Sequence, residues 1–518
     1  MAPTDCNVAL PQLPILQPTI GTAPSRKRGR GRWRALALGG VHVLILLHIA
    51  HYLLYGRTLS PMEPSEAMYT LELGYVNTGA LLLGLAIMTT VVFGRFFCGW
   101  ACHLVALQDL CSFILRRLHV HPKPIRSRAL GILPYVLAFY MFIWPTLIRK
   151  FQGGHHPGFS NQVLTSNFWG TFPGPAIAIL TLTVCGGLIV CLLGNKGFCT
   201  YACPYGALFA IADRAAFGRI RVTDACTHCG HCTAICSSNV LVHEEVRNYG
   251  MVVDSGCMKC MDCVSSCPND ALYFGLTSAP SAAAARRGSN TSRRHYDYPL
   301  VEDIVALTVA GIVTFALRGL YGGPPLLLAL ALGSITGFVT IVLLRLTKRL
   351  DVRLQHWTLR KKGQLTSVGR VFVVGLVAWF VFITHSTYVQ YHTYRGNRLL
   401  GQASVTWDDL IMGSLRAPLL SPERRNAVYT ADEHFRKAEN QGLMEIAEVQ
   451  IGRGCIALLT DDAVAAEAHL QRAYRCQPSA SALGEILFDL RPLVVRQRTE
   501  VEGAQESIQR THQQIYAE

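Results

Sequence analysis

Charged side chains are scarce in this chain. Only 16% of its 518 residues are Asp, Glu, Lys or Arg, whereas a soluble domain has about 25%. The deficit is local, because several windows of about twenty residues carry almost no charge. This pattern excludes an ordinary soluble protein and predicts transmembrane helices. Acidic residues are the scarcer kind, which leaves a formal net charge of +15.

Three common site motifs are also absent. The sequence contains no Gly-rich dinucleotide fingerprint, no P-loop and no His-Glu-x-x-His motif. An excess of basic residues can indicate nucleic acid. Here, however, the basic residues cluster beside the apolar windows, where the positive-inside rule puts them. We therefore attribute the charge to membrane topology and expect a lipid bilayer, and no nucleic acid, as the partner.

Seven apolar windows predict membrane spans in an α-helical polytopic protein. They lie near residues 35–55, 75–97, 130–148, 174–193, 301–322, 324–346 and 369–389. Pro134 and Pro145 predict kinks in the third window. Lys and Arg are abundant after the second and sixth windows and sparse in the opposite loops. This predicts an N-terminus and a cysteine-rich region in the cytoplasm, an external C-terminal region, and a bacterial-type inner membrane as the location.

Eight of the eighteen cysteines form two runs. In runs of this spacing, a tight loop aims three thiolates at one 4Fe–4S cluster, and a short helix carries the fourth cysteine to the other cluster. The x2-x2-x3 spacing therefore predicts two clusters with crossed ligands. The expected ligands are Cys226, Cys229, Cys232 and Cys267 for the first cluster, and Cys236, Cys257, Cys260 and Cys263 for the second.

Structural zinc is the alternative for these runs, since it also uses Cys-x2-Cys pairs. Zinc takes four ligands per site, usually as two separated pairs, and has no use for crossed fourth ligands. Disulfides would spread the cysteines differently along the chain. The region from Cys226 to Cys267 thus resembles the bacterial-type two-cluster ferredoxins, which are α+β modules.

Two further cysteine pairs follow apolar windows. Cys98-x3-Cys102 ends the second window and Cys199-x3-Cys203 ends the fourth. On a helix, an x3 spacing would put both thiols on one face. Four thiols from two span ends could close around a third cluster or another soft metal. The alternative is that they are small buried residues, because free cysteine packs like a small hydrophobe.

In this combination of spans, Cys-x3-Cys pairs and a ferredoxin module, residues 35–275 resemble the membrane polyferredoxins. The resemblance implies electron transfer, since members serve nitrate reductase electron supply (NapH), nitrous oxide reductase maturation (NosR) and cytochrome oxidase assembly (CcoG). This chain departs from the family pattern at His103, where proline often follows the second cysteine. It also shows no recognisable external flavin domain, and its tail favours helices where the oxidase-assembly members end in a β-sandwich.

Histidines in the first and last windows leave three interpretations open. His42, His48 and His51 lie in the first window, and His385 and His392 lie in or after the last. They could bind haem, serve a quinol site as proton acceptors, or be packed or interfacial side chains. We favour the last interpretation and do not expect haem. The loop pair at 155–156 is more typical of solvated histidine than of a metal site.

The C-terminal region contains a weak internal repeat. Ala431, Phe435 and Ala438 repeat, 35 residues earlier, the positions of Ala466, Leu470 and Ala473. With Gly454 and Pro478, this spacing is typical of a tetratricopeptide (TPR) helix pair, although an amphipathic helical bundle would also produce it. The tail is expected to be helical and soluble, and to contact an external protein client.

These observations divide the chain into six expected parts. They are a disordered basic N-terminus (1–34), a four-span membrane domain (35–215), a ferredoxin domain (216–278), a linker (279–299), a three-span membrane domain (300–392) and a helical, TPR-like external domain (393–518).

Membrane electron transfer is the leading functional prediction. Electrons would pass between a cytoplasmic or quinol donor and a membrane or external acceptor, with redox proteins as partners. One alternative is a maturation or assembly factor that reduces a metal or thiol of a client enzyme. A redox or oxygen sensor is a third hypothesis. The sequence contains no catalytic constellation, so it does not decide whether the chain is an enzyme.

Overall fold

The computed structural model describes residues 29–515, except 121, 152, 156–157, 173, 278–295, 404–406, 413–419 and 477–480. Four expectations therefore fall largely or wholly outside the described residues. They are the disordered N-terminus, the linker, Pro478, and the second histidine of the 155–156 pair.

Five helices among the described residues are long and apolar enough to cross a membrane. They are α1 (Gly29–Tyr55), the continuous stretch of α8 (Pro175–Leu182), η4 (Thr183–Leu188) and α9 (Ile189–Leu193), then α16 (Leu300–Leu317), α17 (Leu326–Lys348) and α18 (Ser367–Gln402). A sixth crossing forms if the bent pair of α6 (Leu133–Phe142) and α7 (Trp144–Phe151) counts as one span. The chain is thus a multi-pass membrane protein, as six of the seven windows predicted.

The bend in the third window follows from its prolines. Helices α6 and α7 meet at 47° across Ile143. Pro145 lies in the first turn of α7, where the missing N–H costs nothing and the ring resists continuation of α6. The kink expected at Pro145 is confirmed, whereas Pro134 lies in the first turn of α6, away from the bend.

The second expected span is wrong in length. Helix α3 (Thr78–Phe93) has 16 residues, and strand β2 (Tyr75–Val76) occupies the start of the window. Asn77 caps α3 by accepting a hydrogen bond from the N–H of Ala80, and Gly94 ends it with a φ of 75°. An apolar window does not reveal these two ends, because capping and positive φ are decided by individual residues.

The cysteine-rich region folds around one antiparallel strand pair. Strand β5 (Gly218–Val222) pairs with β6 (Leu272–Leu276). Between them lie α12 (His231–Ala234), α13 (Val242–Tyr249) and α14 (Asp262–Ser265). We call residues 218–276 the cysteine module.

The C-terminal region is helical, as expected. After α19 (Trp407–Ile411) come α20 (Pro422–Gln441), α21 (Ala447–Leu459), α22 (Ala463–Cys476) and α23 (Ser481–Ile515). The residues of the two repeat patterns on α20 and α22 are completely buried. Phe435 lies between Gly396 of α18 and Gly452 of α21, each so close that a Cβ would meet its ring at 2.5 Å. Helix α18 therefore continues from the apolar bundle into the tail.

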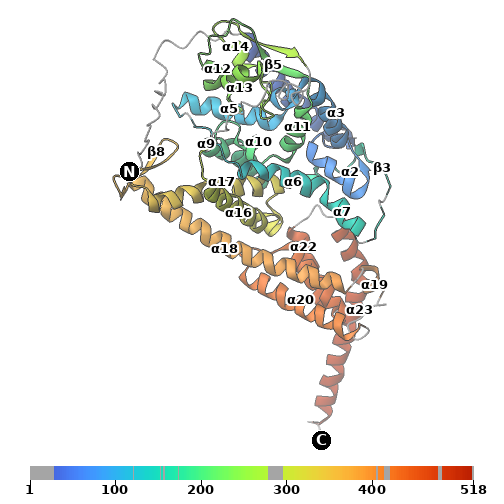
Figure 1. Ribbon diagram of the computed structural model, residues 1–518. Coiled ribbons are helices and arrows are strands. Elements are labelled where there is room, and N and C mark those ends of the chain that lie inside the picture. Colours follow the sequence, from blue (N-terminus) through green and yellow to red (C-terminus); the bar gives the residue numbers. More distant parts are fainter. Residues whose placement is uncertain are drawn as a thin grey trace, which may run out of the picture.

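Figure 1 shows the cysteine module at one end of the bundle and the C-terminal helices at the other. Helix α17 is the most buried of the apolar helices and packs against α16. A three-stranded sheet, β7 (Val352–Leu354), β8 (Trp357–Lys361) and β9 (Gln364–Leu365), joins α17 to α18. Small strand pairs, β1 (Thr58–Leu59) with β4 (Leu164–Thr165) and β2 with β3 (Ser160–Asn161), join the loops after α1, α2 (Ala67–Leu73) and α7.

Candidate metal centres

The expected first ligand set surrounds one cavity. Cys226, Cys229, Cys232 and Cys267 all line it, although Cys267 lies 35 residues beyond Cys232. Helix α12 carries Cys232, and Cys267 follows α14. Ala271 donates its backbone N–H to the Cys267 sulfur across 3.3 Å. Cys229 is exposed, so this end of the module faces outward.

The second ligand set also comes together, in a more buried place. Cys257 and Cys263 are buried in one apolar cluster, and Cys236 packs against it. Burial, and then the neighbouring Cys257 thiol, raises the pKa of Cys236 to about 12. Burial and the nearby Cys260 thiol raise the pKa of Cys263 well above its ordinary value. Such thiols stay protonated at neutral pH unless a metal displaces the proton.

The two runs share one backbone pattern, which explains how they wrap. His228 and Gly230 in the first run have φ of 54° and 74°, and Lys259 and Met261 in the second have 51° and 64°. Asn239 and Asp270, each three residues after the last cysteine of a run, are also left-handed. The left-handed residues between the first three cysteines of each run curl the Cys-x2-Cys-x2-Cys segment into a tight loop, as the spacing predicts.

The membrane cysteine pairs do not lie on single helices, contrary to the sequence expectation. Cys98 lies in the short helix α4 (Phe96–Trp100), but Cys102 is the N-cap of α5 (His103–Arg117). Likewise Cys199 lies in α10 (Gly197–Tyr201), and Cys203 is the N-cap of α11 (Pro204–Arg214). Each pair therefore spans a helix break, because Ala101 and Ala202 leave the helical conformation between the two cysteines.

Cys98 is buried in one apolar cluster, and Cys102, Cys199 and Cys203 are partly buried and pack against it. Burial, followed by the Cys199 and Cys98 thiols, raises the pKa of Cys102 to about 12. Burial raises the pKa of Cys203 well above its ordinary value, with Cys199 and Cys102 as further causes. Gln108 donates to the Cys199 sulfur at 3.2 Å, and the Gly206 N–H donates to the Cys203 sulfur at 3.3 Å.

Within the described part of the chain, no three His, Cys, Asp or Glu side chains converge closely enough to hold one metal ion. A cubane cluster is wider than an ion, so its ligand sulfurs stand further apart while still enclosing one space. Each of the three groups gathers its four thiols from two chain segments.

The cysteine module sits directly on the membrane cysteine segment. Gly99, between Cys98 and Cys102, is so close to the Met258 carbonyl oxygen that a Cβ would lie 2.3 Å from it. Trp100 donates its indole N–H to the Lys259 carbonyl oxygen at 3.0 Å. Arg34 of α1 donates to the Gly99 carbonyl at 2.8 Å and lies 3.5 Å from Asp262 of the module.

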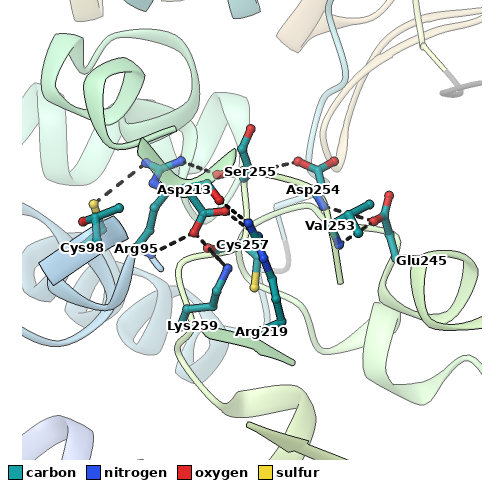
Figure 2. A network of polar contacts seen from close by, with 12 residues as sticks. Arg95, Cys98, Asp213, Arg219, Glu245, Val253, Asp254, Ser255, Cys257 and Lys259 are labelled. Atoms are coloured by element: carbon teal, nitrogen blue, oxygen red, sulfur yellow. Dashed lines mark hydrogen bonds and ion pairs between the residues drawn. The ribbon is translucent and has the colours of Figure 1, made fainter. Parts of the chain in front are cut away.

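A buried ionic network, which the sequence did not predict, stabilises this junction (Figure 2). Asp213 of α11 is fully buried and pairs with Arg219 at 2.7 Å and Lys259 at 3.1 Å. It also accepts the backbone N–H of Arg95 at 3.0 Å. The Arg95 guanidinium donates to the Ser255 carbonyl at 2.9 Å and approaches the Cys98 sulfur at 3.9 Å. The sequence contains one indication of this network, since Arg95 and Lys196 each lie three residues before the first cysteine of a pair.

The histidines of α1 are held by local hydrogen bonds. His42 contacts the Leu38 carbonyl, His48 the Leu59 carbonyl and His51 the Thr58 hydroxyl. In α18, His385 contacts the Gln441 carbonyl at 2.7 Å. His392 lies 2.7 Å from His434 of α20, Nδ1 to Nδ1.

A bundle of apolar helices with cysteines gathered at one end is the architecture of a membrane iron–sulfur protein.

Comparisons with known proteins agree with this class. A 4Fe-4S binding domain matches residues 78–121 and 175–222, which contain the two Cys-x3-Cys pairs. A 4Fe-4S dicluster domain matches residues 225–272, which contain both cysteine runs. No solved structure matches the chain significantly.

Curated relatives align with less than half of the chain. An uncharacterized protein of Methanocaldococcus jannaschii is 27% identical over 212 residues, or 38% of this chain and 80% of that protein. The ferredoxin-type protein NapH of Escherichia coli is 24% identical, over 44% of this chain and 78% of NapH. The regulatory protein NosR of Pseudomonas aeruginosa is 25% identical, over 44% of this chain but only 30% of NosR. These matches support a membrane polyferredoxin of the NapH and NosR type, in agreement with the resemblance seen in the sequence.

Proposed function

We propose that this protein is a one-electron relay between a cytoplasmic or quinol donor and an acceptor in the membrane or outside it. Its 4Fe–4S domains support electron transfer in general. A bound 4Fe–4S cluster takes up and gives back one electron at a time. The proposed ligands are the two crossed sets of the module and, for a third centre, Cys98, Cys102, Cys199 and Cys203.

One observation carries the proposal: the module loop with Cys257 and Cys260 lies on the membrane segment with Cys98 and Cys102. The Gly99–Met258 contact leaves no room for a side chain, so the two segments touch through their backbones. The Trp100–Lys259 hydrogen bond holds the same contact in register. Two sets of cysteines held this way suit electron transfer. The rate of electron transfer falls steeply with the distance between centres, and the rigid contact keeps that distance short.

The exposure of the ligands supports an order along the relay. Cys229 of the first set is exposed, whereas Cys257 and Cys263 of the second are buried beside the membrane segment. The first set is therefore the proposed face for a redox partner, and the membrane thiols are the far end. The basic segments after α5 and α17 support a cytoplasmic position for the module.

Serine variants of the membrane cysteines test the relay. If the four thiols hold one centre, any single Cys→Ser should lose nearly as much electron transfer as the quadruple variant, because a centre missing one ligand is poorly held. Iron in the full-length, anaerobically purified protein should fall from about twelve to about eight per chain. Small, additive effects with unchanged iron would show that the four thiols are only packing residues.

A second candidate function is assembly of a respiratory metalloenzyme, with the C-terminal helices as the docking domain. The observation in its favour is the continuity of α18, whose 36 residues run from the bundle into the packing around Phe435. A client held on this tail would be fixed relative to the membrane. Deleting residues 420–518 would then abolish client maturation while leaving reduction of the iron–sulfur centres intact. Unchanged client maturation in this deletion variant would contradict the role.

A further inference from the structure

The two Cys-x3-Cys segments carry a basic residue at the same position. Arg95 is the N-cap of α4 and Lys196 is the N-cap of α10, and each precedes its first cysteine by three residues. Both are almost completely buried, with exposures of 4% and 3%. A buried cation at a duplicated position, beside four thiols that are neutral when protonated, needs an anion to balance it.

Arg95 lacks the usual anion. Among the described residues, no carboxylate lies within salt-bridge distance of its guanidinium, since Asp213 is engaged by Arg219 and Lys259. The guanidinium donates to a carbonyl oxygen of the module, and its nearest thiol is Cys98 at 3.9 Å. Its Nε is buried without a hydrogen-bond partner in the described structure. The side chain thus approaches the membrane thiols, and among the described residues no carboxylate makes a salt bridge to it; Asp213 contacts its backbone N–H and not its guanidinium.

Lys196 occupies the corresponding place in the second segment. Its ammonium group pairs with Asp109 of α5, which also pairs with Arg34. The charge contacts are therefore crossed: the Arg95 backbone is bound by an acid from the second segment's helix, and Lys196 by an acid from the first segment's helix. Each of these two acids serves two or more basic partners, so neither is devoted to a single cation.

We propose that Arg95, together with Lys196, supplies the positive charge that balances the anionic centre held by the four membrane cysteines, and so raises that centre's reduction potential. The inference rests on the proposed third centre. Four thiolates around a cubane cluster leave a net negative charge, which grows by one when the cluster is reduced. A fixed cation nearby stabilises the reduced form more than the oxidised form. Both residues tune the centre and neither is a ligand.

The test is a potentiometric titration, followed by EPR, of the full-length protein purified without oxygen. Arg95→Gln and Lys196→Gln should each shift the midpoint potential of the membrane centre downward. Arg95→Lys, which keeps the charge, should stay near the wild-type potential. Arg453→Gln is the control, since Arg453 of α21 is a partly buried cation paired with Glu439, and the C-terminal helices lie at the opposite end of the bundle from the cysteine module (Figure 1).

Two failures can be distinguished. If iron content is the same in the wild type and the quadruple serine variant, no membrane centre exists and the proposed function falls. If that iron difference is present but both glutamine variants keep the wild-type potential, only the role of Arg95 and Lys196 is overturned. If Arg95→Gln prevents the membrane centre from binding iron, the midpoint potentials of Lys196→Gln and of the charge-keeping Arg95→Lys are compared instead. Equal potentials in these two variants overturn the proposal.

Discussion

The indole nitrogen of Trp100 lies 3.0 Å from the carbonyl oxygen of Lys259, 159 residues further along the chain. This hydrogen bond joins the segment of the first membrane cysteine pair to the loop of the second cysteine run. Trp100 is partly buried and its ring stacks on Phe96 at 5.0 Å, which fixes the indole orientation. The pair therefore defines how the cysteine module is seated on the membrane domain.

Replacing Trp100 by phenylalanine should weaken the contact between the cysteine module and the membrane domain. The ring would still stack, but the Lys259 carbonyl would lose its donor, at a cost of about 1 kcal/mol. We expect weaker magnetic coupling between the module and membrane centres in the EPR spectrum of the reduced protein. Trp169→Phe is the control, because Trp169 is exposed and its ring contacts are with Phe168 and Phe172. Unchanged coupling in Trp100→Phe would mean that the hydrogen bond does not hold the junction.

Gly99→Ala should disrupt the junction more strongly. The new Cβ would lie 2.3 Å from the Met258 carbonyl oxygen, which is backbone and cannot rotate away. Overpacking of this kind costs about 1–3 kcal/mol. We expect a lower thermal midpoint of the detergent-solubilised protein and slower reduction of the membrane centre. Gly84→Ala in α3 is the matched control, since a Cβ there meets nothing within 4 Å. Equal midpoints in the two variants would contradict the contact.

The crossed ligand sets predict which cysteine variants resemble each other. Cys236→Ser should remove the same EPR signal as Cys257→Ser, although Cys236 belongs to the first run. Cys267→Ser should instead resemble Cys226→Ser, because these two thiols line one cavity. Redox-poised EPR and iron counting on the full-length variants would check this. If variants group by run and not by crossed set, the ligand assignment is wrong.

Membrane topology can be checked independently. Reporters fused after residue 215 should read as cytoplasmic, and reporters fused after residue 400 as external. Figure 1 shows the cysteine module, which follows residue 215, and the C-terminal helices at opposite ends of the helical bundle. Both reporters on the same side would remove a relay across the membrane, because the tail and the module would then share a compartment.

Acidification should loosen the C-terminal helices from α18. The 2.7 Å contact between the Nδ1 atoms of His392 and His434 needs one proton, and a second would place two charges together. Burial, followed by Lys437 and Arg395, lowers the pKa of His434, with Glu433 opposing. A lowered histidine pKa means that stability is present above the unfolded value of about 6.5 and is lost as the pH falls through the folded value.

Hydrogen exchange in α20 measured between pH 8 and pH 5 would show this loss as faster exchange below about pH 6.5. His434→Gln should flatten the profile, since glutamine keeps a polar side chain but does not titrate. A profile that is the same in the wild type and in His434→Gln would rule out this histidine pair as the cause.

The sequence by itself determined the chemistry and the helical membrane class. The ligand spacing of Cys226–Cys236 and Cys257–Cys267 is local, and the left-handed residues that curl both loops repeat with it. The apolar windows are equally local, because about twenty uncharged residues can satisfy their backbone polar groups in lipid only as a helix. The length of α3 was missed because a single cap at Asn77 and a single turn at Gly94 set it.

Only the tertiary structure decided which of these local parts meet. The contact of Gly99 with Met258 and the ion pair of Asp213 with Lys259 join segments far apart in the sequence. Spacing along the chain does not encode such contacts, because they depend on how whole helices and the module pack together. For the same reason the duplicated cations at Arg95 and Lys196 were visible in the sequence, but their burial beside four thiols was not.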